Sequence, residues 1–450
     1  GNGYAQTKDL PYGVYTVHQT RGWEGRELVP DFDVYVAEDG KTYRYLINDA
    51  IFKSYIKIVK KDAESGKVIP YAGAGFQLYR PDGTKITQTV SYPDMAVIDT
   101  FYTNDEGYLI TPEALVYGKG YYLVEVAAPQ GYVLDSTPVY FDVSEDNAIK
   151  EDAVFLMEVV KENTAQKGTI KINKTGEVFS TVIENNGIYQ PVYTVQGLPG
   201  AVFEITAAED IYTPDGTLRY SAGQVVDTVT TGKDGTAESK ALYLGKFKIR
   251  ETTAPAGMVA SKEVHSVELT YAGQEVQVTE TSASISNERQ KVAVTLEKSM
   301  EQNEQFGIGM NGEIIAVTFG LYAAEKVTAA DGTEIPADGL IEIISINENG
   351  HGAVSTDLPH GSYYLKEQAS DSHYILSDEK YPVAFENAGQ DTALVEIKIN
   401  DGNAIENRLI YGSVHGLKKD DDGNALAGAV MGLFRTDETE FTADNALMTD

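Results

Sequence analysis

The feature that most constrains this chain is a sequence unit that recurs at intervals of about 120 residues. Each copy contains a strand-like run that ends in a lysine, at Lys60, Lys174, Lys298 and Lys418, with spacings of 114, 124 and 120 residues. In the complete copies, this lysine is followed by a Gly-Ala-x-Phe-like string and a polar turn that ends in glycine. A Gly-x-Tyr/Phe run into a glutamate comes next, and an asparagine closes the unit. The repeats predict a tandem array of similar domains.

The spacing of the repeats sets the expected domain boundaries. Three complete units are predicted at 53–165, 166–290 and 291–410. Residues 1–52 match the second half of a unit and residues 411–450 match the first half, so we expect the chain to begin and end within domains. Each closing asparagine lies only eleven positions before the next lysine. Units that abut so closely are expected to form a rod.

Within each unit the local pattern favours β-structure. Short apolar-polar alternations are separated by glycine-containing turns at intervals of roughly 8 to 15 residues, as in Asn104-Asp105-Glu106-Gly107. The 29 Tyr and 14 Phe add to the strand propensity, and no sustained helical period is present. The sequence therefore predicts an all-β fold of tandem Ig-like β-sandwiches.

Composition excludes several classes of function. The net charge of −32 argues against nucleic acid or an anionic membrane as the main partner. The chain has no Cys and only six scattered His, so we expect no disulfide, no metal site and no cofactor. No Ser-His-Asp set or glycine-rich phosphate loop can be assembled, and no run of 18 apolar residues is present. A turnover enzyme is therefore not expected.

Charged side chains recur at positions where the alternation predicts a core. Residues i, i+2 and i+4 of a strand share one face, so Ile56, Ile58 and Lys60 point the same way. The glutamate strands repeat this pattern, and so do the closing asparagines of the second and third units, whereas the strand that ends at Asn163 follows it less clearly. The inward residues are Lys60, Lys174 and Lys298; Glu125, Glu251 and Glu367; and Asn163, Asn287 and Asn407.

Burial of a single lysine usually has an ordinary explanation, such as a strand end, a snorkelling side chain or a salt bridge. Three lysines in phase with three glutamates and three asparagines favour a chemical one. Burial lowers the pKa of a lysine and raises that of a glutamate, so a close pair can exchange a proton and become neutral. A neutral lysine amine is a nucleophile, and a protonated glutamate can polarise the asparagine carbonyl. Attack of Nζ on Cγ would expel ammonia and leave an amide cross-link, once per domain.

The combined pattern resembles the Cna B-type, SpaA-like (prealbumin-like) domains of Gram-positive pilins and adhesin stalks, and the resemblance covers essentially the whole chain. It rests on the order Lys, Gly-Ala-x-Phe, Gly-x-Tyr-x-x-x-Glu-x-x-Ala-Pro-x-Gly-Tyr and Asn. The resemblance implies prealbumin-like sandwiches with spontaneous Lys–Asn isopeptide bonds assisted by an acid. By motif match, these would join Lys60 to Asn163 with Glu125, Lys174 to Asn287 with Glu251, and Lys298 to Asn407 with Glu367.

Some positions depart from the family pattern. The Ala-Pro-x-Gly string is present at Ala128–Gly131 and Ala254–Gly257, but the third unit has Ala369-Ser370-Asp371-Ser372-His373 in its place. In the leading half-unit, Gln19 occupies the glutamate position and cannot shuttle a proton. The asparagine there is Asn48, whose unit would have no bond or would use another acid such as Glu24. Lys418 lacks its glutamate and asparagine within this sequence.

The expected function is structural. The resemblance implies a stalk segment of a secreted, cell-wall-anchored Gram-positive adhesin or pilus-like protein, in contact with neighbouring repeats of its own chain. It also implies sortase anchoring to peptidoglycan, although no Leu-Pro-x-Thr-Gly signal is present. The alternative is an adhesin module in which one repeat binds a host glycan or matrix protein. Its only hint is the aromatic group Trp23, Tyr43 and Tyr45.

Overall fold

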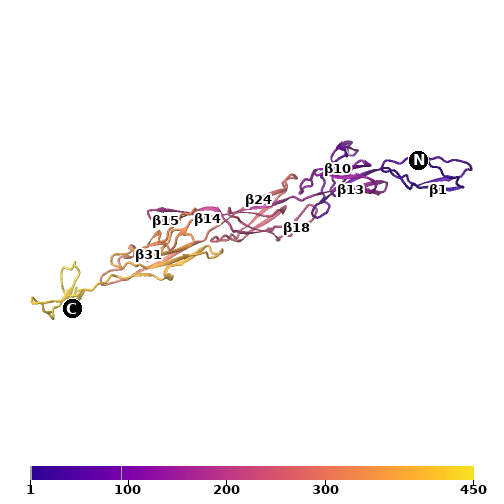
Figure 1. The fold of residues 1–450 in the computed structure, drawn as a ribbon. Coiled ribbons are helices and arrows are strands. Elements are labelled where there is room, and N and C mark those ends of the chain that lie inside the picture. The colour runs from indigo at the N-terminus through magenta and orange to yellow at the C-terminus, as the bar shows by residue number, and fades with distance from the viewer. Residues whose placement is uncertain (1–2, 93, 450) are drawn as a thin grey trace.

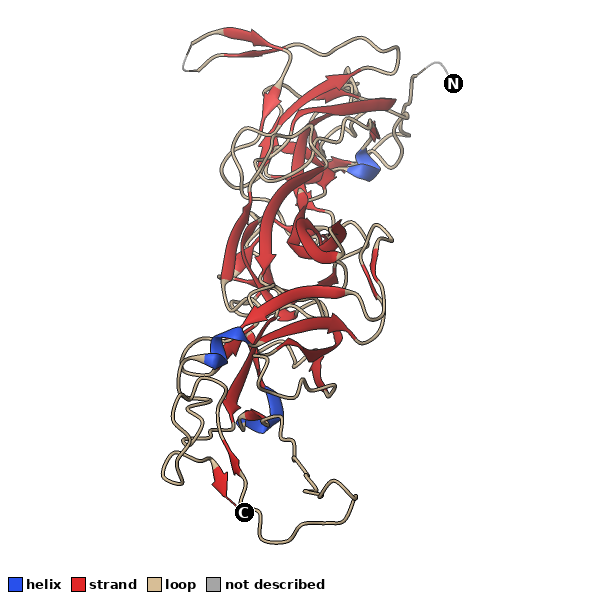
Figure 2. Ribbon diagram, turned by 90° about the vertical axis from the view of Figure 1, so that its left-hand side faces the viewer, coloured by secondary structure: helices blue, strands red, loops and turns tan. Residues whose placement is uncertain are grey.

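The computed structural model describes residues 3–92 and 94–449. The chain forms an extended rod with its two ends at opposite extremes (Figure 1). β-Strands dominate the described residues, in which the helices are three short 3-10 turns, η1, η2 and η3 (Figure 2). The predicted all-β fold of tandem sandwiches is therefore confirmed. None of the helices described is long and apolar enough to cross a bilayer.

The first unit consists of two packed sheets. Its elements are β3 (Lys53–Asp62), β4 (Gly75–Tyr79), β5 (Gln88–Val90), β6 (Ala96–Ile98), β7 (Phe101–Tyr102), β8 (Tyr108–Ile110), β9 (Leu115–Val116), β10 (Gly118–Ala127), β11 (Val139–Val143), η1 (Glu145–Asn147), β12 (Ile149–Glu151) and β13 (Val154–Asn163). One sheet has the order β12-β13-β3-β8, with β9 also on β3, and the other has the order β11-β10-β4-β7. The short β5–β6 hairpin lies outside both sheets.

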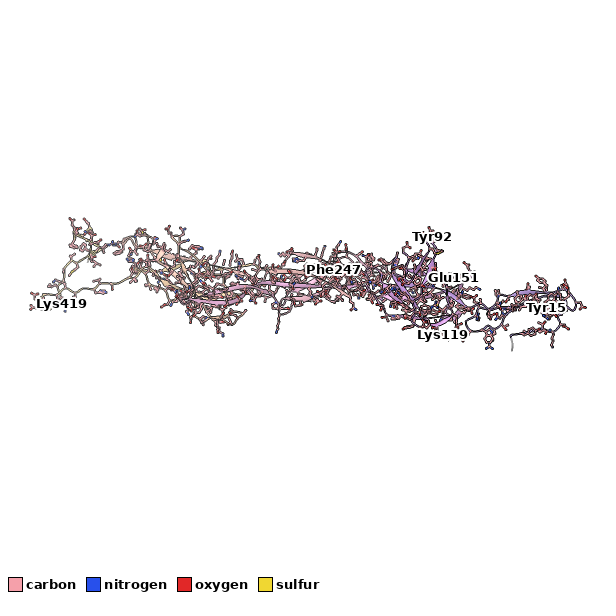
Figure 3. The ribbon with its side chains drawn as sticks, turned by 90° about the horizontal axis from the view of Figure 1, so that it is seen from above. Tyr15, Tyr92, Lys119, Glu151, Phe247 and Lys419 are labelled. Atoms are coloured by element: carbon pink, nitrogen blue, oxygen red, sulfur yellow. The ribbon has the colours of Figure 1, made fainter. Side chains whose placement is uncertain are left out.

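The second unit repeats this arrangement with one enlarged hairpin. Its elements are β14 (Lys167–Asn185), β15 (Ile188–Gly197), β16 (Val202–Ala207), β17 (Ile211–Tyr212), β18 (Leu218–Tyr220), β19 (Val225–Thr230), β20 (Thr236–Glu238), β21 (Leu242–Tyr243), β22 (Gly245–Thr253), β23 (Val264–Leu269) and β24 (Val278–Asn287). Strand β14 pairs with β15, β20, β21 and β24, and the second sheet has the order β19-β16-β22-β23. Figure 3 places Phe247, on β22, within the body of the rod.

The third unit has the same two layers. Its elements are β25 (Lys291–Met300), η2 (Glu313–Ala316), β26 (Thr318–Ala323), β27 (Val327–Thr328), β28 (Glu334–Ile335), β29 (Leu340–Ser345), β30 (His351–Ala353), β31 (Gly361–Ala369), β32 (Lys380–Phe385), β33 (Leu394–Lys398), η3 (Ile399–Gly402) and β34 (Ile405–Asn407). Strand β25 pairs with β30, β33 and β34, and β29-β26-β31-β32 form the facing sheet. Toward the ends of the chain, the described residues form the pairs β1 (Gly13–Val17) with β2 (Phe32–Val36), and β35 (Gly432–Leu433) with β36 (Met448–Thr449).

All three units share one strand pairing that matters for the site. The first strand runs parallel to the closing strand, as β3 with β13, β14 with β24, and β25 with β33 and β34. The glutamate-bearing strand runs antiparallel to the Gly-Ala-x-Phe strand in the facing sheet, as β10 with β4, β22 with β16, and β31 with β26. The start and end of each unit therefore lie side by side, and the remainder of the unit connects them.

Each unit has its own apolar core between its two sheets, because the inward positions of the alternating strands are apolar. In the first unit Ile56, Ile58, Phe76 and Leu123 are fully buried. Equivalent residues fill the other two cores: Ile170, Ile172, Phe203 and Ile249, and Val294, Leu296, Phe319 and Leu365.

A hairpin of the second unit extends onto the third. Strand β15 pairs in parallel with β29 through Ile188 and Leu340, so one sheet continues from the second unit into the third. Val182 and Tyr189 of this hairpin pack against the core of the third unit. The backbone N–H of Ala330 donates to Phe179 O at 3.0 Å and that of Asp331 to Ser180 O at 3.1 Å.

Candidate functional site

The topology brings three polar side chains of each unit to one end of its core. The lysine lies on the first strand, the glutamate on the facing sheet, and the asparagine at the end of the closing strand. In the parallel ladders, Asn163 pairs with Asp62, Asn287 with Gly176, and Asn407 with Met300. Each of these partners lies two residues beyond the lysine of its strand. The asparagine and the lysine therefore share the inward face.

In the first unit, the three side chains are fully enclosed and in contact. Lys60 and Glu125 are 0% exposed and Asn163 is 1% exposed. Lys60 Nζ lies 2.7 Å from Glu125 Oε1 and contacts Asn163 Oδ1. Asn163 Nδ2 donates to Glu125 Oε2 at 2.7 Å and to Val133 O at 2.7 Å. One carboxylate thus bridges the amine and the amide nitrogen.

The second unit has the same arrangement, but its lysine lies farther from the glutamate. Lys174 Nζ lies 3.1 Å from Glu251 Oε1 but makes no hydrogen bond of good geometry. Asn287 Nδ2 donates to Glu251 Oε2 at 2.8 Å and also to Val259 O. Asn287 Oδ1 is buried and accepts no hydrogen bond. Buried polar atoms without a hydrogen bond are rare in folded proteins. Lys174 Nζ and Asn287 Oδ1 therefore mark this cluster as a candidate functional site.

The third unit differs in what its lysine contacts. Lys298 Nζ donates to Ser299 O at 3.0 Å and to Ile405 O at 2.8 Å, and no ion pair within 4.0 Å joins it to Glu367 in the described residues. Asn407 Nδ2 donates to Glu367 Oε1 at 2.7 Å and to Ser370 Oγ at 2.8 Å. The acid and the amide are therefore positioned as in the other units, whereas the amine turns to backbone carbonyls.

A glycine turn fixes the backbone of each lysine. The N–H groups of Lys60, Lys174 and Lys298 donate to the carbonyls of Gly107, Gly235 and Gly350 at 2.9, 2.8 and 2.7 Å. These glycines have φ of 81°, 78° and 82°. A Cβ at any of these glycines would lie too close to a backbone oxygen. The distances would be 2.0 to 2.4 Å, to the carbonyls of Ile69, Lys174 and Lys298 in the three units. The polar turn seen in the sequence is therefore a support for the lysine that only glycine fits.

Burial shifts the lysines toward the neutral amine. Desolvation lowers the pKa of Lys60 to about 8, against the opposing attraction of Glu125. Desolvation likewise lowers the pKa of Lys298 to about 8, and lowers that of Lys174. The ammonium groups lie over aromatic rings, with Nζ 5.6 Å from the Phe76 centroid in the first unit and 5.7 Å from that of Phe203 in the second. These phenylalanines pair directly with Glu125 and Glu251 across the sheet.

A family model for the SpaA prealbumin-like fold domain matches the chain three times, at residues 54–155, 192–283 and 310–402. This chain belongs to the SpaA prealbumin-like fold domain family. The second match begins within β15, so it leaves out β14 and the start of β15 in the second SpaA-type unit. No curated protein matches the sequence.

Several solved structures are similar to this SpaA-type chain. The Bacillus anthracis TIE protein is 18% identical with a TM-score of 0.47, over 84% of this chain and 54% of that one. This chain thus spans about half of the TIE structure. BcpA, the major pilin subunit of Bacillus cereus, is 17% identical with a TM-score of 0.29, over 80% of this chain and 100% of BcpA. The pilus adhesin SpaC from Lactobacillus rhamnosus GG is 12% identical with a TM-score of 0.29, over 80% and 45% of the two chains.

Some contacts around the buried clusters of these SpaA-type units could not be predicted from the sequence. The carbonyls of Val133 and Val259 hold the asparagine amide, but a backbone oxygen leaves no residue-type signal. Ser370 does leave one, since it stands at the position of Ala128 and Ala254 in the other units. Its hydroxyl accepts from Asn407 Nδ2, where the other units use a backbone carbonyl. Lys161 is also buried, and its Nζ pairs with Asp135 at 2.7 Å.

The flanking half-units contain no comparable cluster in the described residues. Gln19 binds Asp49 and the backbone of Val29, while Asn48 and Lys418 are exposed. Glu24 is exposed and contacts Tyr117 and Lys119 of the first complete unit. Of the aromatic group noted in the sequence, Trp23 is 81% exposed and Tyr45 packs on Phe32. No group of His, Asp or Glu side chains arranged to hold a metal ion is present between residues 3 and 449, leaving out residue 93.

Proposed function

We propose that this chain is a structural stalk segment of a Gram-positive cell-surface adhesin or pilus-like protein, and that each complete unit closes itself with a Lys–Asn isopeptide bond. The observation that carries the proposal is the repeated enclosure of a lysine, a glutamate and an asparagine at one end of each core. A lone buried charge is costly, and three such clusters in register are hard to explain by packing. The bonds would join Lys60 to Asn163, Lys174 to Asn287, and Lys298 to Asn407.

The contacts of the first unit suit this chemistry. Glu125 Oε1 can take a proton from Lys60 Nζ, which leaves a neutral amine beside the asparagine amide. Nζ attacks Cγ, the Nζ–Cγ bond forms and the Cγ–Nδ2 bond breaks. A second Nζ proton passes through the carboxyl group to Nδ2, which Glu125 Oε2 already contacts. Ammonia departs, and the first proton leaves the carboxyl group for solvent. Fixed placement supplies the acceleration that an unreactive amide needs.

A stalk role is supported by the architecture and by the printed names of similar proteins. Three units abut in a rod, and the similar structures include a major pilin subunit and a pilus adhesin. The proposal places the chain outside the cell, attached to the wall by sortase, with neighbouring units as its first partners. A bond across roughly 100 residues of chain stabilises a domain by about 4–5 kcal/mol if it acts as a disulfide loop does. Unlike a disulfide, an amide persists in any redox environment.

The test is the intact mass of the denatured chain. We expect a deficit of three ammonia molecules relative to the sequence mass. Glu251→Ala should restore one ammonia and lower the unfolding temperature of the second unit alone, because its proton carrier is gone. Digestion followed by mass spectrometry should find each lysine peptide joined to its asparagine peptide.

Glu268→Ala is the matched control, since Glu268 is an exposed glutamate of the same unit. Its mass deficit should equal that of the wild type. A wild-type chain with the full sequence mass would refute the cross-linking chemistry, while the stalk architecture would stand.

A further inference from the structure

The two junctions between complete units are built from the same hydrogen bonds. Strands β23 and β32 are each followed by an Ala-Gly-Gln sequence, Ala272–Gln274 in the second unit and Ala388–Gln390 in the third, which we term the Gln loops. Each Gln loop contacts the unit that precedes it in the chain. Equivalent residues make the contact at both junctions, so it is a recurring feature of the array and not particular to one interface.

A buried glutamine at the junction with the preceding unit holds each Gln loop. Gln166 and Gln290 each lie three residues after the closing asparagine and are 1% exposed. Gln166 Nε2 donates to Gly273 O at 2.9 Å and its Oε1 accepts from the N–H of Ala272 at 2.9 Å. Gln290 makes the same contacts with Gly389 O and with the N–H of Ala388.

The Gln loop in turn holds the segment of the preceding unit that positions the reacting groups. At the first junction, Gln274 Oε1 accepts from the N–H of Ala128 at 2.8 Å, and Gln274 O accepts from that of Leu134 at 2.9 Å. Leu134 lies between the two residues that contact the site. The carbonyl of Val133 holds Asn163 Nδ2, and the N–H of Asp135 donates to Glu125 Oε2 at 3.1 Å.

The second junction repeats these contacts. Gln390 Oε1 accepts from the N–H of Ala254 at 2.9 Å, and Gln390 O accepts from that of Ala260 at 2.8 Å. Ala260 is flanked by Val259, whose carbonyl holds Asn287 Nδ2, and by Ser261, whose N–H donates to Glu251 Oε2 at 2.7 Å. At both junctions, the following unit fixes the residue between two backbone contacts to the site. One is the carbonyl that holds the asparagine amide, and the other is the N–H that donates to the glutamate.

The third unit has Ile410 at the position of Gln166 and Gln290. In this unit Asn407 binds Ser370 instead of a backbone carbonyl, and Lys298 contacts backbone carbonyls.

We infer that Gln274 and Gln390 are positioning residues that act across the junction, each aligning the cross-linking site of the preceding unit. This inference rests on the proposed function. The folding of one unit would then promote the cross-link of the unit before it, so the first two units would mature with help from their neighbours.

The test follows cross-linking over time in the full 450-residue chain. The chain is synthesised in a cell-free system, samples are quenched in acid and digested, and the joined peptides are quantified by mass spectrometry. Gln274→Met keeps the side-chain size but removes the acceptor for Ala128. We expect Lys60–Asn163 linkage to slow about tenfold, which is the order of one positioning hydrogen bond, while Lys174–Asn287 linkage keeps its rate.

Three further variants separate positioning from general destabilisation. Gln274→Glu retains an acceptor and should restore the rate. Gln390→Met should slow Lys174–Asn287 linkage and leave Lys60–Asn163 linkage unchanged. Gln166→Ile, which copies Ile410, removes the side chain that holds the first Gln loop. It should slow Lys60–Asn163 linkage and leave Lys174–Asn287 linkage unchanged. Equal Lys60–Asn163 time courses in the wild type and Gln274→Met, or slowing confined to the second unit, would overturn this inference. Absence of any linkage in the wild type would instead refute the proposed function.

Discussion

At the scale of residues, the lysine–glutamate pairs are costly in an unlinked unit. Lys60 and Glu125 are fully enclosed, and removing two charges from water costs more than their mutual attraction commonly returns. The proposed amide is neutral. Bond formation would therefore remove a buried ion pair as well as close a loop, and both changes would stabilise the folded unit.

This cost predicts a pH dependence in a unit that cannot cross-link. In Glu251→Ala, Lys174 stays buried without its counter-ion, and desolvation holds its pKa below the ordinary value. The unfolded chain, with a lysine pKa of about 10.4, then binds more protons than the folded one in alkaline solution. The free energy of unfolding of the second unit should rise with pH from neutrality toward about 10.4.

Calorimetry of the second-unit transition across this range provides the measurement. The double variant Lys174→Met/Glu251→Ala has no titrating lysine at the site and should lose this rise with pH. The wild type should lose it too, because an amide nitrogen does not titrate there. A rise of equal size in the double variant would assign the effect to other groups.

The sequence predicts the inward direction of the clustered residues because strand alternation is a local rule. Ile58 and Lys60 share a face whatever the rest of the fold does. The anchors of the asparagine amide were not predictable in this way, since Val133 acts through its carbonyl. The Gln loops did leave a signal, a repeated Ala-Gly-Gln and a glutamine three residues after the asparagine. The role of this repeated signal can be inferred only once the contacts between neighbouring units are known.

At the scale of elements, the β14–β15 hairpin is the most unusual feature. It continues the first sheet of the second unit beyond its own core and supplies a strand to the third unit. Arg289, which is buried, reinforces this contact, lying over the Tyr193 ring at 3.8 Å and pairing with Glu177 at 3.4 Å and with Asp357 of the third unit. The sequence pattern predicts that β14 and β15 are strands. It does not predict that β15 pairs with β29, because β29 lies about 150 residues away in the chain.

The hairpin contact predicts that changes in the second unit destabilise the third. Val182→Ser and Tyr189→Ser remove apolar contacts with the third core and should each lower its free energy of unfolding by about 1 kcal/mol. Ile183→Ser is the control, because Ile183 lies on the same hairpin and is 52% exposed. Hydrogen exchange of β26 and β31 amides reports the change. Faster exchange in the second unit alone would contradict the contact.

At the scale of the whole molecule, the parallel pairing of first and last strands defines how tension travels. Lys60 lies near the end of β3 and Asn163 at the end of β13, where the chain leaves the unit. With the proposed bond in place, a pull on the two ends of the rod would follow β3, cross to Asn163 and enter the next unit. The remaining strands of the sandwich would carry no load.

Single-molecule stretching tests this path. In the wild type, the first unit should release no hidden length, because its 103-residue span between Lys60 and Asn163 is bypassed. In Glu125→Ala, the same unit should unfold with a gain in contour length of about 350 Å, at up to ~3.5 Å per residue. A gain of this size in the wild type would show that the bond is absent.

The same strand pairing has a consequence for damage. Since the start and end of each unit would be fastened at a single point, the polypeptide between them becomes a side loop of the filament. Tyr92, at the β5–β6 hairpin, projects into solvent (Figure 3), and Met95 is 81% exposed. A protease that cut this hairpin would open that loop without severing the rod. A nicked unit would then still transmit tension through its cross-link.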